Sequence, residues 1–214
     1  IVEREDKWET KLENTKILIL KDSPEDHEFE SKWLPFLRQL SEGQRFPDGK
    51  IQITRVNVPV LLIVAEKLSL RLIITMNQNK DVVKWVWFRP TTAGKNVKEI
   101  YKDLGAMVGG TIVDEENGTF LSKFSVDSLG SAESAVIGRH DAVITVGENR
   151  MLANEYLDRI NEVKGQVTSA EDEVEQGHIK ERLANLSGGI ATIKVASATG
   201  QDTNELKLRI EDAI

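Results

Sequence analysis

The chain has 214 residues, of which 40% are hydrophobic and 29% charged, and its formal net charge is -7. A chain of this length can bury a substantial core, and the acidic balance argues against a nucleic-acid-binding face. No apolar stretch approaches the roughly 20 residues of a membrane-spanning helix, and the absence of cysteine excludes a disulfide framework and a thiolate metal site.

The absence of cysteine also fits a reducing, cytoplasmic compartment. The sequence begins with Ile1 rather than Met and ends at Ile214 inside a helical pattern. We therefore expect a piece of a longer polypeptide.

The first half of the chain alternates strands with short helices. KILIL at 16–20 predicts a strand. Ser31 is placed to cap a helix over 32–40 that Gly43 would end, with Pro35 tolerated in its first turn. Further elements are predicted at 51–66 (strands), 68–78 (a short helix) and 82–88 (a strand).

The second half changes from mixed to helical patterning. A helix at 95–110 ends at a Gly-Gly pair, and Asn117-Gly118 predicts a type I′ hairpin turn before strands at 135–147. Two apolar stripes then predict an antiparallel helical hairpin whose second arm is N-capped near 171–173. The stripes are Leu152, Tyr156, Ile160, Val163 and Val167, then Val174, Ile179, Leu183 and Leu186. A strand from Ile190 and a helix from about Asp202 complete a mixed α/β layout.

No constellation typical of catalysis or metal binding emerges. His27, His140 and His178 lie far apart in polar contexts, which favours solvated surface positions. The run at 114–116 is acidic but lacks the ligand spacing of a calcium loop. Residues 92–95, TAGK, lack the first glycine and the final Ser or Thr of a phosphate-binding loop. We expect no enzyme, no metal and no cofactor within these residues.

Two short helices carry an excess of large apolar side chains. WLPFLRQL at 33–40 holds more of them than one stripe about 100° wide can bury, and the helix at 68–76 is apolar almost all round. Two interpretations stay open. Either both helices are half-buried on the sheet, or they leave an exposed apolar strip, which usually marks a binding site.

Segments along nearly the whole chain carry a family resemblance. LSGGIATIKVASAT followed by RIEDAI, with TSAEDEVEQGHIKERLANLSGG before it, gives the most specific match. KEIYKDLGAMVGGTIVDEENG, SVDSLGSAESAVI, SKWLPFLRQLSEG and PVLLIVAE extend it toward the N-terminus. Together they resemble the group I chaperonins, the GroEL and Hsp60 family. The stretch FRPTTAGKN and the lack of an aromatic-rich segment ahead of Val2 depart from that family, as in a divergent member.

The resemblance implies a fold and a division into domains. Residues 1–190 would form the apical domain, a β-sandwich-like α/β core flanked by helices, and 191–214 the C-terminal segment of the intermediate domain. Asp212 matches the carboxylate that helps to orient water for ATP hydrolysis in the family. The equatorial domain with its phosphate-binding loop is absent from the sequence, so ATP and Mg would belong to a full-length parent and not to this fragment.

The resemblance also implies a function. The apical domain of the family captures non-native polypeptides, and a co-chaperonin lid, in a groove between two helices. Here Leu34 and Leu37 match the first helix, and Leu70, Ile73 and Ile74 the second. The parent would form a homo-oligomeric ring and the fragment a monomer, with neither nucleic acid nor membrane as partner. The alternative is an assembly module whose apolar helices dock on one fixed protein partner.

Overall fold

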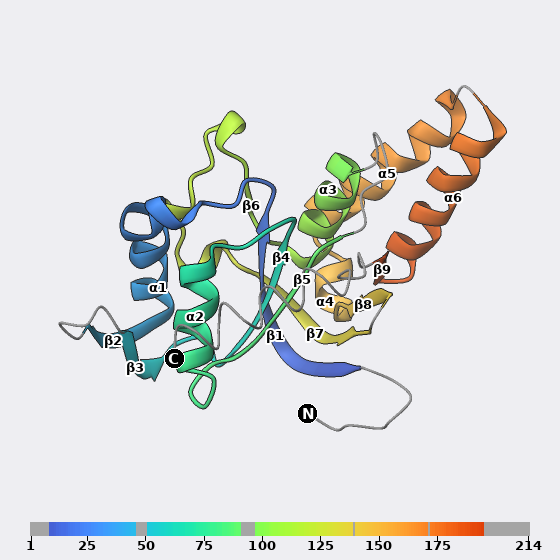
Figure 1. Ribbon diagram of the computed structural model, residues 1–214. Coiled ribbons are helices and arrows are strands. Elements are labelled where there is room, and N and C mark those ends of the chain that lie inside the picture. Colours follow the sequence, from blue (N-terminus) through green and yellow to red (C-terminus); the bar gives the residue numbers. More distant parts are fainter. Residues whose placement is uncertain (1–8, 46–50, 91–96, 139, 171, 195–214) are drawn as a thin grey trace.

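The structure is a computed structural model that describes residues 9–45, 51–90, 97–138, 140–170 and 172–194 (Figure 1). A seven-stranded mixed sheet has the order β5-β4-β1-β7-β8-β9, with β6 paired to β1 beyond the end of β7. These strands are β1 (Thr10–Leu20), β4 (Val60–Ala65), β5 (Lys84–Phe88), β6 (Ile112–Val113), β7 (Gly130–Ile137), β8 (Asp141–Thr145) and β9 (Ile190–Lys194). A separate two-stranded ribbon consists of β2 (Ser41–Arg45) and β3 (Ile51–Val56).

The central strands are buried on both faces because helices cover the sheet on both sides. In β1, Ile17 and Ile19 face one core while Leu18 and Leu20 face the other, as expected from the two-residue period of a strand. Parallel strands buried in this way read as continuous apolar runs, which explains KILIL and VLLIVA. The α/β class is confirmed. In place of the two facing sheets of a sandwich, the described residues form one hydrogen-bonded sheet and a ribbon.

The helices divide between the two faces (Figure 1). One face packs against α1 (Leu34–Leu40) and α2 (Leu70–Gln78), and the other against α3 (Val97–Val108), α5 (Asn154–Ser169) and α6 (Glu173–Ser187). The short α4 (Glu148–Met151) precedes α5. In the part of the chain that the structure describes, every helix is too short or too polar to cross a membrane.

The predicted helical hairpin is present as α5 and α6. Tyr156, Ile160 and Val163 are buried, and the Asp172 side chain caps α6 by accepting a hydrogen bond of 2.7 Å from the backbone N–H of Glu175. The ends of both predicted stripes are wrong. Leu152 precedes α5 at the base of the hairpin and is 73% exposed. Val174 is 71% exposed because it lies near the turn between α5 and α6, where the hairpin reaches beyond the sheet (Figure 1).

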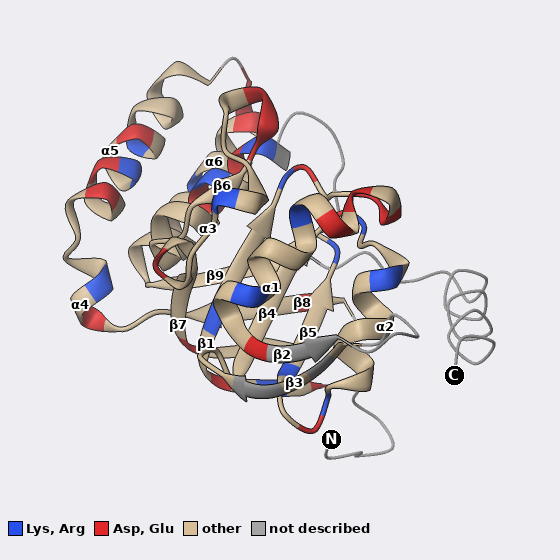
Figure 2. Cartoon of the chain, turned by 90° about the vertical axis from the view of Figure 1, so that its left-hand side faces the viewer, with Lys and Arg blue, Asp and Glu red and all other residues tan. Residues whose placement is uncertain are grey.

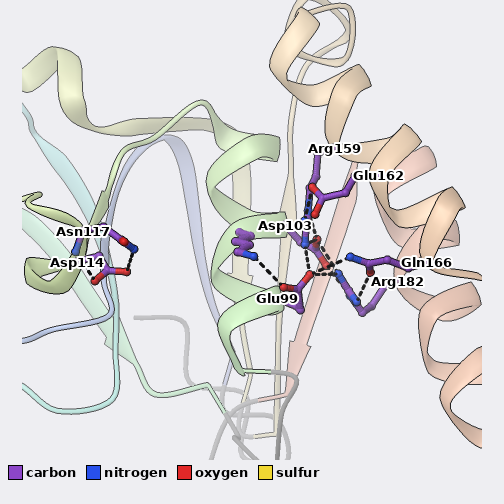
Figure 3. A network of polar contacts seen from close by, with 9 residues as sticks. Glu99, Asp103, Asp114, Asn117, Arg159, Glu162, Gln166 and Arg182 are labelled. Atoms are coloured by element: carbon purple, nitrogen blue, oxygen red, sulfur yellow. Dashed lines mark hydrogen bonds and ion pairs between the residues drawn. The ribbon is translucent and has the colours of Figure 1, made fainter. Parts of the chain in front are cut away.

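An ionic network joins the hairpin to α3 (Figure 3). Arg159 on α5 lies 2.6 Å from Glu99 and 2.7 Å from Asp103, and Arg182 on α6 lies 2.7 Å from Asp103. Burial alone would raise the pKa of Glu99, but hydrogen bonds from Arg159 and Lys102 outweigh it and lower this pKa to about 2. Two helices distant in sequence from α3 are thus held by opposite charges.

Two local predictions are wrong. Asn117 lies in a 3-10 turn (Glu115–Asn117), and Gly118 alone adopts a left-handed conformation, with φ 78°. A type I′ turn needs positive φ at both positions. The turn instead closes an isolated bridge between Asp114 and Thr119. Gly43 does not end a helix but lies in β2, because the chain becomes extended at Ser41.

The predicted boundary between domains falls at the start of β9. This strand pairs with β8 from Thr145–Ile190 to Asp141–Lys194, so the first residues past the boundary belong to the same sheet. The helix predicted from Asp202, together with Asp212, lies outside the described residues. The division at residue 190 stays a prediction.

Candidate functional site

The first helical stretch, Asp26 to Leu40, passes through three helical geometries. A 3-10 turn, η1 (Asp26–Glu28), is followed by a π turn, η2 (Phe29–Trp33), and then by α1. Pro35 has no N–H and cannot bond to the carbonyl of Ser31, so regular α-helix is interrupted here. The N–H of Leu34 bonds to the carbonyl of Phe29 instead. The stretch is capped at Glu25 by a capping box with Glu28, not at Ser31 as predicted.

The N-terminal end of α2 is fixed to this stretch through Asp26. The Ser69 hydroxyl caps α2 by accepting from the N–H of Leu72, and it donates to the Asp26 carboxylate over 2.6 Å. The N–H of Arg71 donates to the same carboxylate oxygen over 3.1 Å. A carboxylate at a helix N-terminus is stabilised by the free N–H groups and the helix dipole.

Arg71 makes two further contacts across the same junction. Its guanidinium lies 2.6 Å from the Glu30 carboxylate and 4.4 Å from the centroid of the Phe29 ring. Phe29 is buried, whereas Arg71 and Glu30 are partly exposed. The flank of the first stretch that carries Glu30 therefore faces α2.

The C-terminal ends of both helices are joined by the ribbon. The N–H of Asn57 donates to the carbonyl of Leu40 over 2.8 Å. Beyond α2, the buried Asn79 side chain accepts from the N–H of Ile53 and donates to the carbonyl of Ile51, both at 2.7 Å. Because both ends are connected, α1 and α2 are held in a fixed relation over the sheet.

The structure divides the predicted groove residues into two sets. Leu34 on α1 and Leu70 and Ile74 on α2 are half-buried and offer apolar surface to solvent. Leu37 and Ile73 are only 6% and 5% exposed. We call Leu34, Leu70 and Ile74 together with the exposed Arg38 the two-helix surface.

Ile73 also points away from the first helical stretch. It is two residues from Arg71, so the two side chains point about 160° apart around α2. Since Arg71 contacts Glu30 and Phe29, Ile73 is directed away from the first stretch. Leu34 lies one turn after Glu30, which pairs with α2, whereas Ile73 takes no part in that junction.

Sequence reasoning missed the polar residues that position these helices. Glu30, Arg71 and Asn79 could not be found in this way, because their partners lie 26 to 41 residues away in the chain. Local patterns carry no signal for such pairing. The capping position of Ser69, directly before an apolar helix, was the one readable feature.

The acidic run at 114–116 serves a structural role. Lys21 pairs with Asp114 at 2.8 Å and with Glu116 at 2.6 Å. Lys32 pairs with Glu115 and with Glu28, both at 2.6 Å, and these hydrogen bonds raise the pKa of Lys32. Within the described ranges no group of His, Asp or Glu side chains is placed to hold a metal ion. Residues 91–96, with the TAGK stretch, lie outside those ranges.

Comparison with known proteins identifies the type of fold. No family model matches the chain. Among solved structures it is similar to the chaperonin gp146 from the bacteriophage EL (Pseudomonas aeruginosa), solved in the presence of ATP-BeFx. The TM-score is 0.57 at 14% sequence identity, over 95% of this chain and 36% of that chaperonin. At this identity the likeness shows the fold alone, so the chain has a chaperonin-like fold and spans about a third of the similar protein's length.

Proposed function

We propose that this chain is a polypeptide-binding part of a chaperonin-like protein and captures non-native segments on the two-helix surface. The observation that carries the proposal is the position of Leu34, Leu70 and Ile74, which are half-buried on two adjacent helices of a chaperonin-like fold. Contiguous apolar patches at a protein surface usually mark binding sites.

The mechanism follows from the physics of apolar burial. Covering apolar area is non-directional and contributes about 25 cal/mol per Å², so one surface can bind many unrelated sequences. In a folded client the apolar side chains are already buried. In an unfolded segment they are exposed and can contact Leu34, Leu70 and Ile74. Because α1 and α2 are fixed at both ends, they need little ordering when a client binds.

The proposal places the chain in a larger assembly. In a full-length parent, a homo-oligomeric ring would present several such surfaces, and a co-chaperonin lid could compete for them. Asp212 would support ATP hydrolysis there, with Mg and ATP bound by residues outside this chain. Within the described residues no group of His, Asp or Glu side chains is placed to hold a metal ion.

The test uses two unrelated, permanently unfolded, fluorescently labelled polypeptides, followed by anisotropy. We expect both to bind the wild-type chain, and the double variant Leu34→Ser/Ile74→Ser to weaken both by about tenfold or more. Leu152→Ser is the matched control, because Leu152 is 73% exposed and lies just before α5, which packs on the opposite face of the sheet from α1 and α2. It should leave both affinities unchanged.

Each other result has a definite meaning. Binding of neither polypeptide, or equal binding by the double variant, would refute capture at this surface. Binding of only one fixed protein partner, sensitive to the same double change, would favour the alternative of an assembly module.

A further inference from the structure

We infer that Arg38 makes the two-helix surface selective for extended segments in which an acidic residue stands two positions from a large apolar residue. The inference rests on the proposed function and names the chemistry of the segments that the surface prefers. It is carried by the position, charge and spacing of Arg38 relative to Leu34.

Arg38 lies on the stripe of the first helical stretch that begins at Glu30. Glu30, Leu34 and Arg38 follow one another at intervals of four residues, so they share one face. Glu30 is joined to Arg71 of α2 by the 2.6 Å ion pair, which orients that face. A segment lying along the stripe over Leu34 would therefore pass Arg38.

Three other cations near the N-terminal ends of these helices have carboxylate partners. Lys32 pairs with Glu28 and Glu115, Lys67 with Glu25 at 3.4 Å, and Arg71 with Glu30. Arg38 is exposed and forms no ion pair or hydrogen bond with another residue in the described ranges. Figure 2 shows acidic and basic segments next to one another around α1, so Arg38 is a local positive charge and not part of a broad basic face.

The spacing specifies the sequence of the preferred segment. Four residues of α-helix advance about 6 Å along the axis. In an extended chain, two residues advance about 6.6 Å and place both side chains on the same face. An apolar side chain seated on Leu34 thus puts the residue two positions away beside Arg38. The neighbouring residue, one position away, points to the opposite face.

The experiment compares four labelled peptides of equal length and apolar content on the full chain. Three carry Asp, Asn or Lys two positions from a central Leu, and the fourth carries Asp one position from it. We expect affinity to fall in the order Asp, Asn, Lys, with about twofold to fivefold between steps, the range for one partly exposed ion pair. The shifted Asp should bind like Asn, and the differences should shrink at high salt.

Variants identify the residue responsible. Arg38→Gln should remove the order, and Arg38→Glu should reverse it. Lys164→Glu makes the same change of charge at an exposed position on α5 and should leave the order of peptide affinities unchanged. The preference is refuted if the Asn peptide binds but Asp and Lys peptides bind equally well, or if the order survives both Arg38 variants. If no peptide binds, including the neutral one, the proposed function itself is wrong and the preference falls with it.

Discussion

Arg71 on α2 pairs with Glu30 on the first helical stretch at 2.6 Å while its guanidinium stacks 4.4 Å from the ring centroid of Phe29. One side chain thereby bridges the two helical elements near their N-terminal ends. It does so beside Leu34, the half-buried apolar residue on the same stripe as Glu30. The contact that fixes the helices thus borders the surface proposed to bind clients.

The Glu30–Arg71 pair should contribute modestly to stability, because 44% and 38% of the two side chains are exposed. A double-mutant cycle with Glu30→Gln and Arg71→Gln, measured by urea unfolding, should give a coupling energy of about 0.3–1 kcal/mol at low salt. Raising the salt concentration should reduce it. Arg71→Gln alone should cost more than Glu30→Gln alone, since it also removes the contact with Phe29. A coupling near zero at low salt would show that the pair does not fix the helices.

Leu34 and Leu37 should separate binding from stability. Leu37 is 6% exposed within the core between α1 and the sheet, so Leu37→Ala should lower the free energy of unfolding by about 2–4 kcal/mol. Leu34→Ala should cost no more than about 1 kcal/mol and yet weaken client binding. Urea unfolding and anisotropy on the same samples distinguish the two. Similar destabilisation by both changes would mean that Leu34 belongs to the core.

The strands and most helices could be predicted because their signals are local. KILIL and VLLIVA read as strands buried on both faces, and Ser69 before an apolar helix marks the start of α2. Pro35 also indicates that a regular α-helix cannot begin at Ser31, because its ring nitrogen cannot donate to the carbonyl of Ser31. Its missing N–H explains why the cap moves to Glu25 and a π turn precedes α1.

The arrangement of the site could not be predicted because it depends on distant pairs. Asn79 joins α2 to the ribbon, and Arg159 joins α5 to Asp103 across 56 residues. Whether Leu37 or Leu34 faces solvent depends on the orientation of α1 on the sheet. Contacts between residues distant in the sequence determine that orientation. An apolar pattern shows that a helix has a buried side but not which flank a neighbour leaves open.

Gly165 and Gly177 should be replaceable with a gain in stability. Both lie inside helices of the hairpin, and a Cβ at either position would meet no atom within 4 Å. Gly165→Ala and Gly177→Ala should each raise the free energy of unfolding by about 0.5–1 kcal/mol, because alanine loses less backbone entropy in a helix. Gly130→Ala is the contrasting control, since its Cβ would overlap the side chain of Val108. That change should destabilise the chain in the same thermal or urea measurement.

Glu99 should make the stability of the chain depend on pH. Its pKa is about 2 in the folded chain against an ordinary value of 4.5, since hydrogen bonds from Arg159 and Lys102 outweigh the effect of burial. A lowered pKa means stabilisation that is fully present above pH 4.5 and is lost as the pH falls toward 2. Glu99→Gln should therefore cost roughly 1–3 kcal/mol at pH 7, with Arg159 losing one of its carboxylate partners.

The test is urea unfolding of wild type and Glu99→Gln at pH 7, 5, 4 and 3. The difference in unfolding free energy between the two should be constant at pH 7 and 5 and should narrow at pH 4 and 3. Below the ordinary pKa of 4.5, Glu99 of the unfolded wild-type chain takes up a proton, whereas Glu99 of the folded chain, with a pKa of about 2, does not. Glu181→Gln, at an exposed position on α6, should stay within about 0.5 kcal/mol of wild type at pH 7. A difference that does not change from pH 7 to 3 would mean that the charge of Glu99 does not hold the hairpin on α3, which leaves that role to the ion pairs of Asp103 and to apolar packing around Tyr156 and Val163.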